Sequence, residues 1–81
     1  MKKSERDSIL KWGRSLTHES LEREYYNAVY NSLGSEAERM NELGYDIADI
    51  VKREKYERFL CEKANILEEL CNERGIKLWN E

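Results

Sequence analysis

The chain has 81 residues, 40% of them hydrophobic and 38% charged, with a net charge of −3 when its one histidine is neutral. This composition predicts a single helical domain with a solvated surface and excludes a disordered chain. Residues 1–14 carry a net charge of +3, residues 15–50 carry −6 and residues 51–81 carry zero, which excludes the broad basic face of a general nucleic-acid binder.

The first predicted helix is short and covers residues 4–13. Ser4 is placed to cap its start, and acidic residues follow in the first turn. Ile9 and Trp12 lie three residues apart, which puts both on one side of the helix. Gly13 either ends this helix or lets a neighbouring element approach it closely.

The second predicted helix covers residues 18–33, with Thr17 as its N-cap and Gly34 as its stop. Helical spacing assigns it an inward stripe made of Leu21, Tyr25, Ala28, Val29 and Leu33. Tyr26 and Tyr30 form a second pair four residues apart beside that stripe. The apolar face is therefore wide enough to contact two neighbours or to present tyrosines to a partner.

The third predicted helix covers residues 36–43 and starts at a capping box formed by Ser35 and Glu38. Its inward residues are Ala37, Met40 and Leu43, and Gly44 ends it. Two helices that end in glycine and are followed at once by a capping residue predict tight corners between neighbouring helices.

The fourth predicted helix, residues 47–74, is the longest, at about 42 Å, and the others are expected to pack on it. Asp46 is its N-cap and Gly75 its C-terminal stop. The inward stripe consists of Tyr56, Phe59, Leu60, Ala64, Leu67, Leu70 and Cys71, after an opening group of Ile47, Ile50 and Val51. Leu67 is expected in the core of any version of this fold.

Residues 52–55 interrupt that stripe, because none of them is apolar. The five steps from Val51 to Tyr56 turn a helix by about 500°, so the stripe is displaced sideways by about 140°. Either the helix bends there, or its first two turns pack on a different neighbour, or residues 47–53 form a separate short helix.

The tail, residues 76–81, contains Ile76, Leu78 and Trp79 and is too apolar to extend freely into water. We expect it to pack back along the bundle, with Ile76 against Leu70 or Cys71. The fold prediction is thus an all-α bundle of three short to medium helices on one long C-terminal helix.

Two features indicate a cytoplasmic protein. No stretch is long and apolar enough to cross a membrane, and Lys2 and Lys3 are not followed by the apolar run of a signal peptide. Cys61 and Cys71 lie about 15 Å apart along one predicted helix, whereas a disulfide needs Cα atoms within about 7 Å. They are interpreted as buried thiols that act as small apolar residues.

Neither an enzyme nor a metal or cofactor site is expected. The single histidine, His18, has Glu19 beside it and Glu22 four residues on, but a metal site needs three or four converging ligands. No nucleophile, phosphate-loop or Cys–His motif occurs. His18 is interpreted as a solvated surface residue.

A helix-turn-helix DNA-binding protein is one alternative, with residues 36–55 as the motif. Gly44 would be its turn glycine, and Lys52, Arg53 and Lys55 would contact phosphates. Acidic residues at the start of the would-be recognition helix, and the length of that helix, count against DNA binding. A corner between two bundle helices explains the same spacing.

The interpretation that we favour is a small cytoplasmic interaction or adaptor protein that has no catalytic activity and self-associates, with a homodimer as the expected form. Its expected partner surface uses Trp12, Tyr26, Tyr30 and Trp79, since aromatic residues are enriched at interfaces. A second alternative is an acidic inhibitor of a nucleic-acid-binding protein. Its negative surface would comprise Glu19, Glu22, Glu24, Glu36, Glu38, Glu42, Asp46 and Asp49.

Overall fold

The computed structural model describes residues 2–33 and 36–78 and confirms the all-α fold. Within these residues it contains four α-helices and no strand: α1 (Lys3–Arg14), α2 (His18–Ser32), α3 (Glu36–Glu42) and α4 (Ile47–Glu73). Each helix boundary differs by at most one residue from the range expected from capping residues and apolar spacing.

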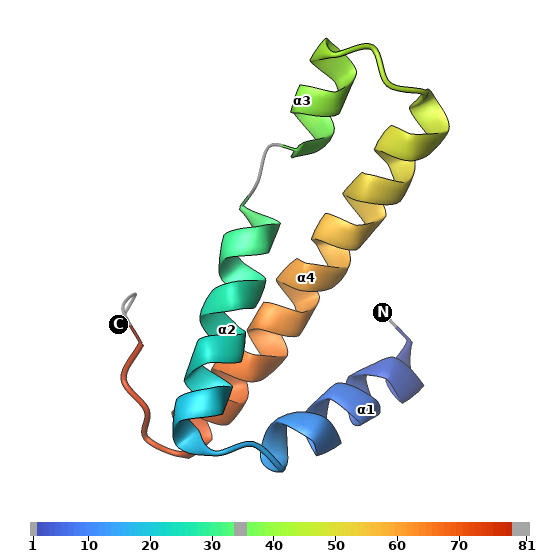
Figure 1. The fold of residues 1–81 in the computed structure, drawn as a ribbon. Coiled ribbons are helices and arrows are strands. Elements are labelled where there is room, and N and C mark those ends of the chain that lie inside the picture. Colours follow the sequence, from blue (N-terminus) through green and yellow to red (C-terminus); the bar gives the residue numbers. More distant parts are fainter. Residues whose placement is uncertain (1, 34–35, 79–81) are drawn as a thin grey trace.

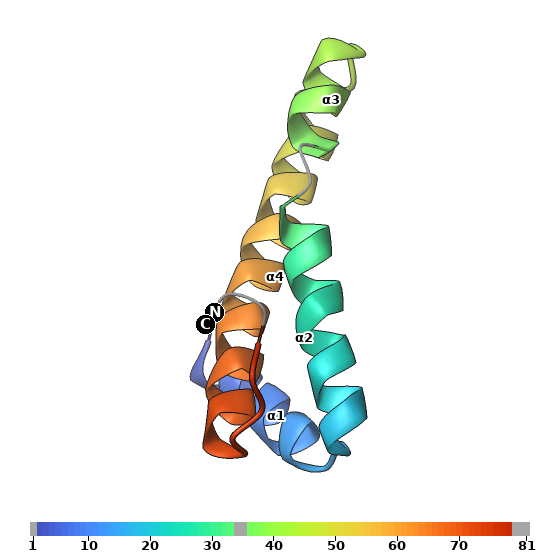
Figure 2. The same ribbon diagram turned by 90° about the vertical axis from the view of Figure 1, so that its left-hand side faces the viewer.

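The helices form a long hairpin that is closed by the turn between α3 and α4, and α1 packs at the opposite, open end. Figures 1 and 2 show α2 and then α3 running along α4 in the opposite direction, while α1 lies across the end where α4 finishes. The molecule measures 44 × 28 × 17 Å, and its radius of gyration is 14.5 Å. A compact chain of this length would have a radius of gyration of about 12 Å. One end of the hairpin therefore projects beyond the packed part.

The hydrophobic core lies where α1, α2 and the second half of α4 meet. Leu21 and Leu67 are fully buried there, and Leu67 thus occupies the position expected from its spacing. The other buried members of this cluster are Tyr25, Ala28, Ala64, Leu70, Cys71 and Leu78. Almost all of the buried apolar surface is therefore concentrated at one end of a 44 Å molecule.

Two glycines end helices by the geometry expected of them. Gly75 has a φ of +73°, and the Ile76 amide donates to the Cys71 carbonyl at 2.9 Å. This six-to-one bond is the Schellman motif, which satisfies carbonyls left free at a helix end. Gly44 has a φ of +79° and ends α3 in the same way. The motif at Gly75 turns the tail back, so that Leu78 is buried and Ile76 packs against the core.

Gly13 lies inside α1 rather than ending it, and it is buried. A Cβ atom added there would lie 2.5 Å from Cδ1 of Leu70 and 3.4 Å from Cδ2 of Leu67. Of the two roles expected for Gly13, the structure therefore shows close approach, between α1 and the side chains of α4.

Only some of the predicted N-cap residues cap their helices. The Thr17 hydroxyl accepts a hydrogen bond from the Ser20 amide at 3.1 Å, as an N-cap should. Asp46 occupies the N-cap position of α4, but its side chain makes no capping hydrogen bond. Ser4 is not a cap, because α1 begins one residue earlier with Lys2 before it. Ser35 of the expected capping box, and Gly34, lie outside the described residues.

Four burial expectations were wrong. Leu33 is 71% exposed, Leu43 is 67% exposed and Tyr56 is 48% exposed. None of the three belongs to the core cluster or packs against it. Cys61 is also exposed rather than buried, and both cysteines are free. Spacing places a residue on a helix face, but the length of the neighbouring helix decides whether that face is covered.

α4 is continuous through residues 52–55, as the single predicted helix requires, and this excludes the third possibility, a separate short helix over residues 47–53. The displaced stripe is nevertheless present. Ile66 is 1% exposed although the predicted stripe omitted it, while Ile47 is 79% exposed and Val51 is 40% exposed. The second half of α4 thus has two buried sides, and its first two turns leave apolar side chains uncovered.

Candidate protein-interaction surface

Four large apolar side chains are exposed together at the turn between α3 and α4. Leu43 and Tyr45 belong to the turn, Ile47 opens α4 and Val51 follows one helical turn later. Their exposed fractions are 67%, 52%, 79% and 40%. We call these four residues the distal apolar surface. Exposed apolar side chains concentrated in one segment are a candidate contact region, whereas single exposed apolar residues need no explanation.

The helices that could cover this surface are too short or lie on another side of α4. α1 contacts the opposite half of α4 through Gly13 and Leu70. α3 has only seven residues, and the inner residues around it are buried Ala37 and half-buried Met40 and Ile50. Ile47 and Val51 are four residues apart, so they share one face of α4 that neither helix covers.

The distal apolar surface lies between segments of opposite charge. Residues 36–49 contain five acidic residues and one basic residue, a net charge of −4, whereas residues 52–58 contain four basic and two acidic residues, a net charge of +2. Asp46, Asp49, Lys52 and Lys55 are exposed, and none of them forms an ion pair with another described residue. These charges can therefore interact with charged groups of a partner. Salt screens such interactions beyond about 8–10 Å.

The aromatic residues expected at a partner surface do not gather in one place. Trp12 is 37% exposed, and the ammonium of Lys63 on α4 lies 4.8 Å from the centre of its ring. This cation–π contact ties α1 to α4. Trp79 lies outside the described residues.

The two tyrosines lie on α2 rather than beside Trp12. Tyr26 is half-buried against the core, with its ring 5.3 Å from that of Tyr25. Tyr30 is 76% exposed. Tyr26 and Tyr30 line one shallow hollow, together with residues of the same helix only. Their surface is thus a ridge of α2, and their role in partner binding stays a prediction.

Of the three basic residues in the DNA-binding alternative, Arg53 interacts with neighbouring side chains and the two lysines are exposed. Arg53 pairs with Glu57 at 3.2 Å and stacks 5.1 Å from the centre of the Tyr56 ring, whereas Lys52 and Lys55 are exposed. α3 runs beside α4 in the opposite direction (Figure 1), while the helices of a helix-turn-helix cross at about 90–120°. This arrangement matches a bundle corner better than a DNA-reading motif.

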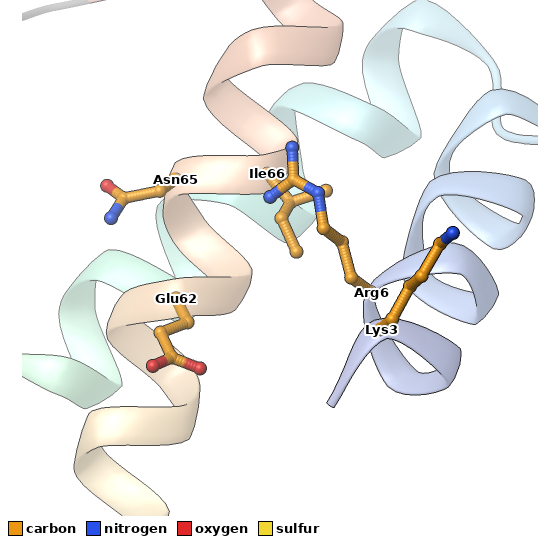
Figure 3. A pocket seen from close by; sticks show the side chains of 5 residues that line it. All are labelled: Lys3, Arg6, Glu62, Asn65 and Ile66. Carbon is orange, nitrogen blue, oxygen red and sulfur yellow. The ribbon is translucent and has the colours of Figure 1, made fainter. Parts of the chain in front are cut away.

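A groove lies between α1 and α4, on the side that faces away from α2. Its largest hollow measures about 400 Å³ and is lined by Lys3, Arg6, Glu62, Asn65 and Ile66. Figure 3 shows the Arg6 side chain reaching from α1 toward Ile66 of α4. Arg6 also pairs with Glu69 at 3.0 Å, which fixes the spacing of the two helices at this level.

The groove continues along α4 toward the projecting end. Two further hollows share the half-buried ring of Phe59, and Ile9 of α1 lines one of them. Lys55 and Arg58 line the other hollow, together with Glu5 and Glu62. The groove therefore has an apolar floor and charged edges.

Residues that could bind a metal ion do not converge in the described part of the chain. His18 is exposed at the start of α2. No group of three or more His, Cys, Asp or Glu side chains among the described residues could hold a metal ion. The described helices also include none with the length and apolar content needed to cross a membrane.

Sequence reasoning did not identify the distal apolar surface as a site, although one signal for it was present. The absence of apolar residues in 52–55 displaced the stripe of α4, and the displaced residues Ile47 and Val51 are the ones left uncovered. Leu43 was assigned to the core, and Tyr45 was not considered. A comparison with protein-family models, curated proteins and solved structures finds no match to this chain.

Proposed function

We propose that this chain is a small cytoplasmic interaction protein that has no catalytic activity and self-associates through the distal apolar surface. The observation that carries the proposal is the uncovered face of α4, where Ile47 is 79% exposed and Val51 is 40% exposed. These β-branched side chains are costly to leave in water and lose little side-chain entropy when they are buried.

A second copy suits this surface energetically. Burying an exposed leucine, isoleucine or valine side chain contributes about 1.5–3 kcal/mol, while association itself costs about 4–15 kcal/mol. The three such residues of one copy, together with Tyr45, barely offset that cost. A twofold contact buries every member of the surface on both chains, which doubles the favourable contribution without a second association cost.

The test is a light-scattering series on the wild-type chain and on the variants Ile47→Asp and Val51→Asp. Ile47 is in the first turn of α4, where an aspartate is compatible with the helix dipole, and Val51 is exposed one turn later, so both changes should leave the fold intact. Leu33→Lys is the control, because Leu33 is 71% exposed, lies outside the distal apolar surface and is the C-cap of α2, where a positive charge is compatible with the helix dipole. Association that survives Ile47→Asp, or that fails equally in the control, would overturn the assignment of the surface.

A further inference from the structure

We infer that each distal apolar surface docks into the groove between α1 and α4 of a second copy, so that two chains associate reciprocally about a twofold axis. This inference rests on the proposed self-association and names the surface that receives the distal end. It follows from three properties of the two surfaces: apolar complementarity, charge, and their separation along α4.

The groove offers the apolar surface that the distal end needs. Phe59 and Ile9 are half-buried at its floor, and the buried Ile66 lines its largest hollow. α1 approaches α4 closely at Gly13, whereas Ile9 and Phe59 are only partly covered. The distal apolar surface of a second copy, inserted between α1 and α4, would therefore cover Phe59 and Ile9, which no described element covers completely.

The charges of the two surfaces are opposite. The distal segment, residues 36–49, carries a net charge of −4. The groove is edged by the basic residues Lys3, Arg6, Lys55 and Arg58, against two acidic residues, Glu5 and Glu62. The Arg6 charge is partly balanced by Glu69 at 3.0 Å, so Lys3, Lys55 and Arg58 are the main attractive groups. Complementary charges of this kind select the partner surface and its orientation.

The distances along α4 agree with an antiparallel arrangement. Ile47 and Phe59 are twelve residues apart, or about 18 Å, and Val51 and Phe59 lie within about 80° of each other around the helix. A twofold axis near residue 53 would place Ile47 of each chain beside Phe59 of the other. A parallel pairing would instead align the two acidic segments, which repel each other.

The test uses two charge-reversed variants and their mixture. The distal variant is Glu42→Lys with Asp46→Lys, and the groove variant is Lys55→Glu with Arg58→Glu. Each alone places like charges in both contacts and should raise the dimer Kd by about tenfold or more. An equimolar mixture pairs a basic distal end with an acidic groove and also an acidic distal end with a basic groove. The mixture should therefore form a heterodimer close to wild-type affinity, measured by sedimentation velocity.

Matched controls reverse the same number of charges elsewhere. Glu19→Lys with Glu24→Lys changes α2, and Lys11→Glu with Lys77→Glu changes basic residues that line none of the three hollows of the groove. Circular dichroism verifies that every variant is folded. A wild-type dimer that Ile47→Asp disrupts but that neither charge variant weakens would overturn the docking geometry and leave self-association intact. Failure of the mixture to restore binding would also overturn it, and a monomeric wild-type chain would overturn both proposals.

Discussion

The guanidinium of Arg74, the residue that follows the last turn of α4, donates a hydrogen bond to the backbone carbonyl of Leu16 at 2.7 Å. The same group donates to the carbonyls of Arg14 at 3.0 Å and Gly13 at 3.4 Å. Carbonyls at the end of a helix have no partner within that helix. One side chain from the end of α4 thus caps the end of α1 and holds the connection to α2.

Arg74→Ala should therefore destabilise the fold by about 1–3 kcal/mol, the range for losing hydrogen bonds to a charged donor. Urea unfolding followed by circular dichroism measures the change. Arg23→Ala is the control, since Arg23 makes only an exposed contact with Ser20 at 3.5 Å. An equal loss of unfolding free energy in both variants would show that the three carbonyl contacts of Arg74 do not stabilise the fold.

Gly13→Ala should also destabilise the protein, although alanine is usually the better helix former by about 0.5–1 kcal/mol. The added methyl group would lie 2.5 Å from Cδ1 of Leu70, which is 2% exposed and has little room to move. Overpacking of this kind costs about 1–3 kcal/mol. Adding Gly13→Ala to a Leu70→Ala background should cost less than adding it to wild type. A stabilised single variant would contradict the close contact.

Leu67→Ala should cost about 2–5 kcal/mol, because Leu67 is fully buried and its removal leaves a cavity. Leu43→Ala should change the unfolding free energy of the monomer by less than about 0.5 kcal/mol, since Leu43 is 67% exposed. Both leucines were expected to be buried from their spacing. Chemical denaturation at low protein concentration compares them without a contribution from association.

A gel-shift at low salt tests the DNA-binding alternative. We expect no shift with duplex DNA, because Arg53 is held by Glu57 and the adjacent distal segment is acidic. A shift that Lys52→Glu or Lys55→Glu abolishes would favour the alternative over a protein-interaction role. A pull-down with a basic nucleic-acid-binding protein addresses the acidic-inhibitor alternative in the same buffers.

The helices were predictable because their limits depend on local signals. Thr17 caps α2 with its own hydroxyl, and Gly44 and Gly75 adopt the positive φ values for which glycine is suited. Burial was less predictable, because it depends on how far a neighbouring helix extends. Leu60 and Leu67 are buried, whereas Tyr56, one turn before Leu60 on the same expected stripe, is 48% exposed.

The contacts of individual side chains could not be predicted from spacing. Lys63 meets Trp12, and Arg74 meets Leu16, across long separations in the sequence. The position of α1 fixes these pairs, and no local pattern encodes it. The exposed face of Ile47 and Val51 had a sequence signal, the displacement of the stripe, but its exposure depends on the positions of α1 and α3, which no local pattern encodes.

Solution mass, measured by light scattering across a concentration series, tests the central claim most directly. The account predicts that the mass rises from the 9.7 kDa of one chain toward about twice that value. Ile47→Asp should hold the mass at the monomer value over the same range. A wild-type chain that stays at 9.7 kDa at every concentration would contradict self-association through the distal apolar surface.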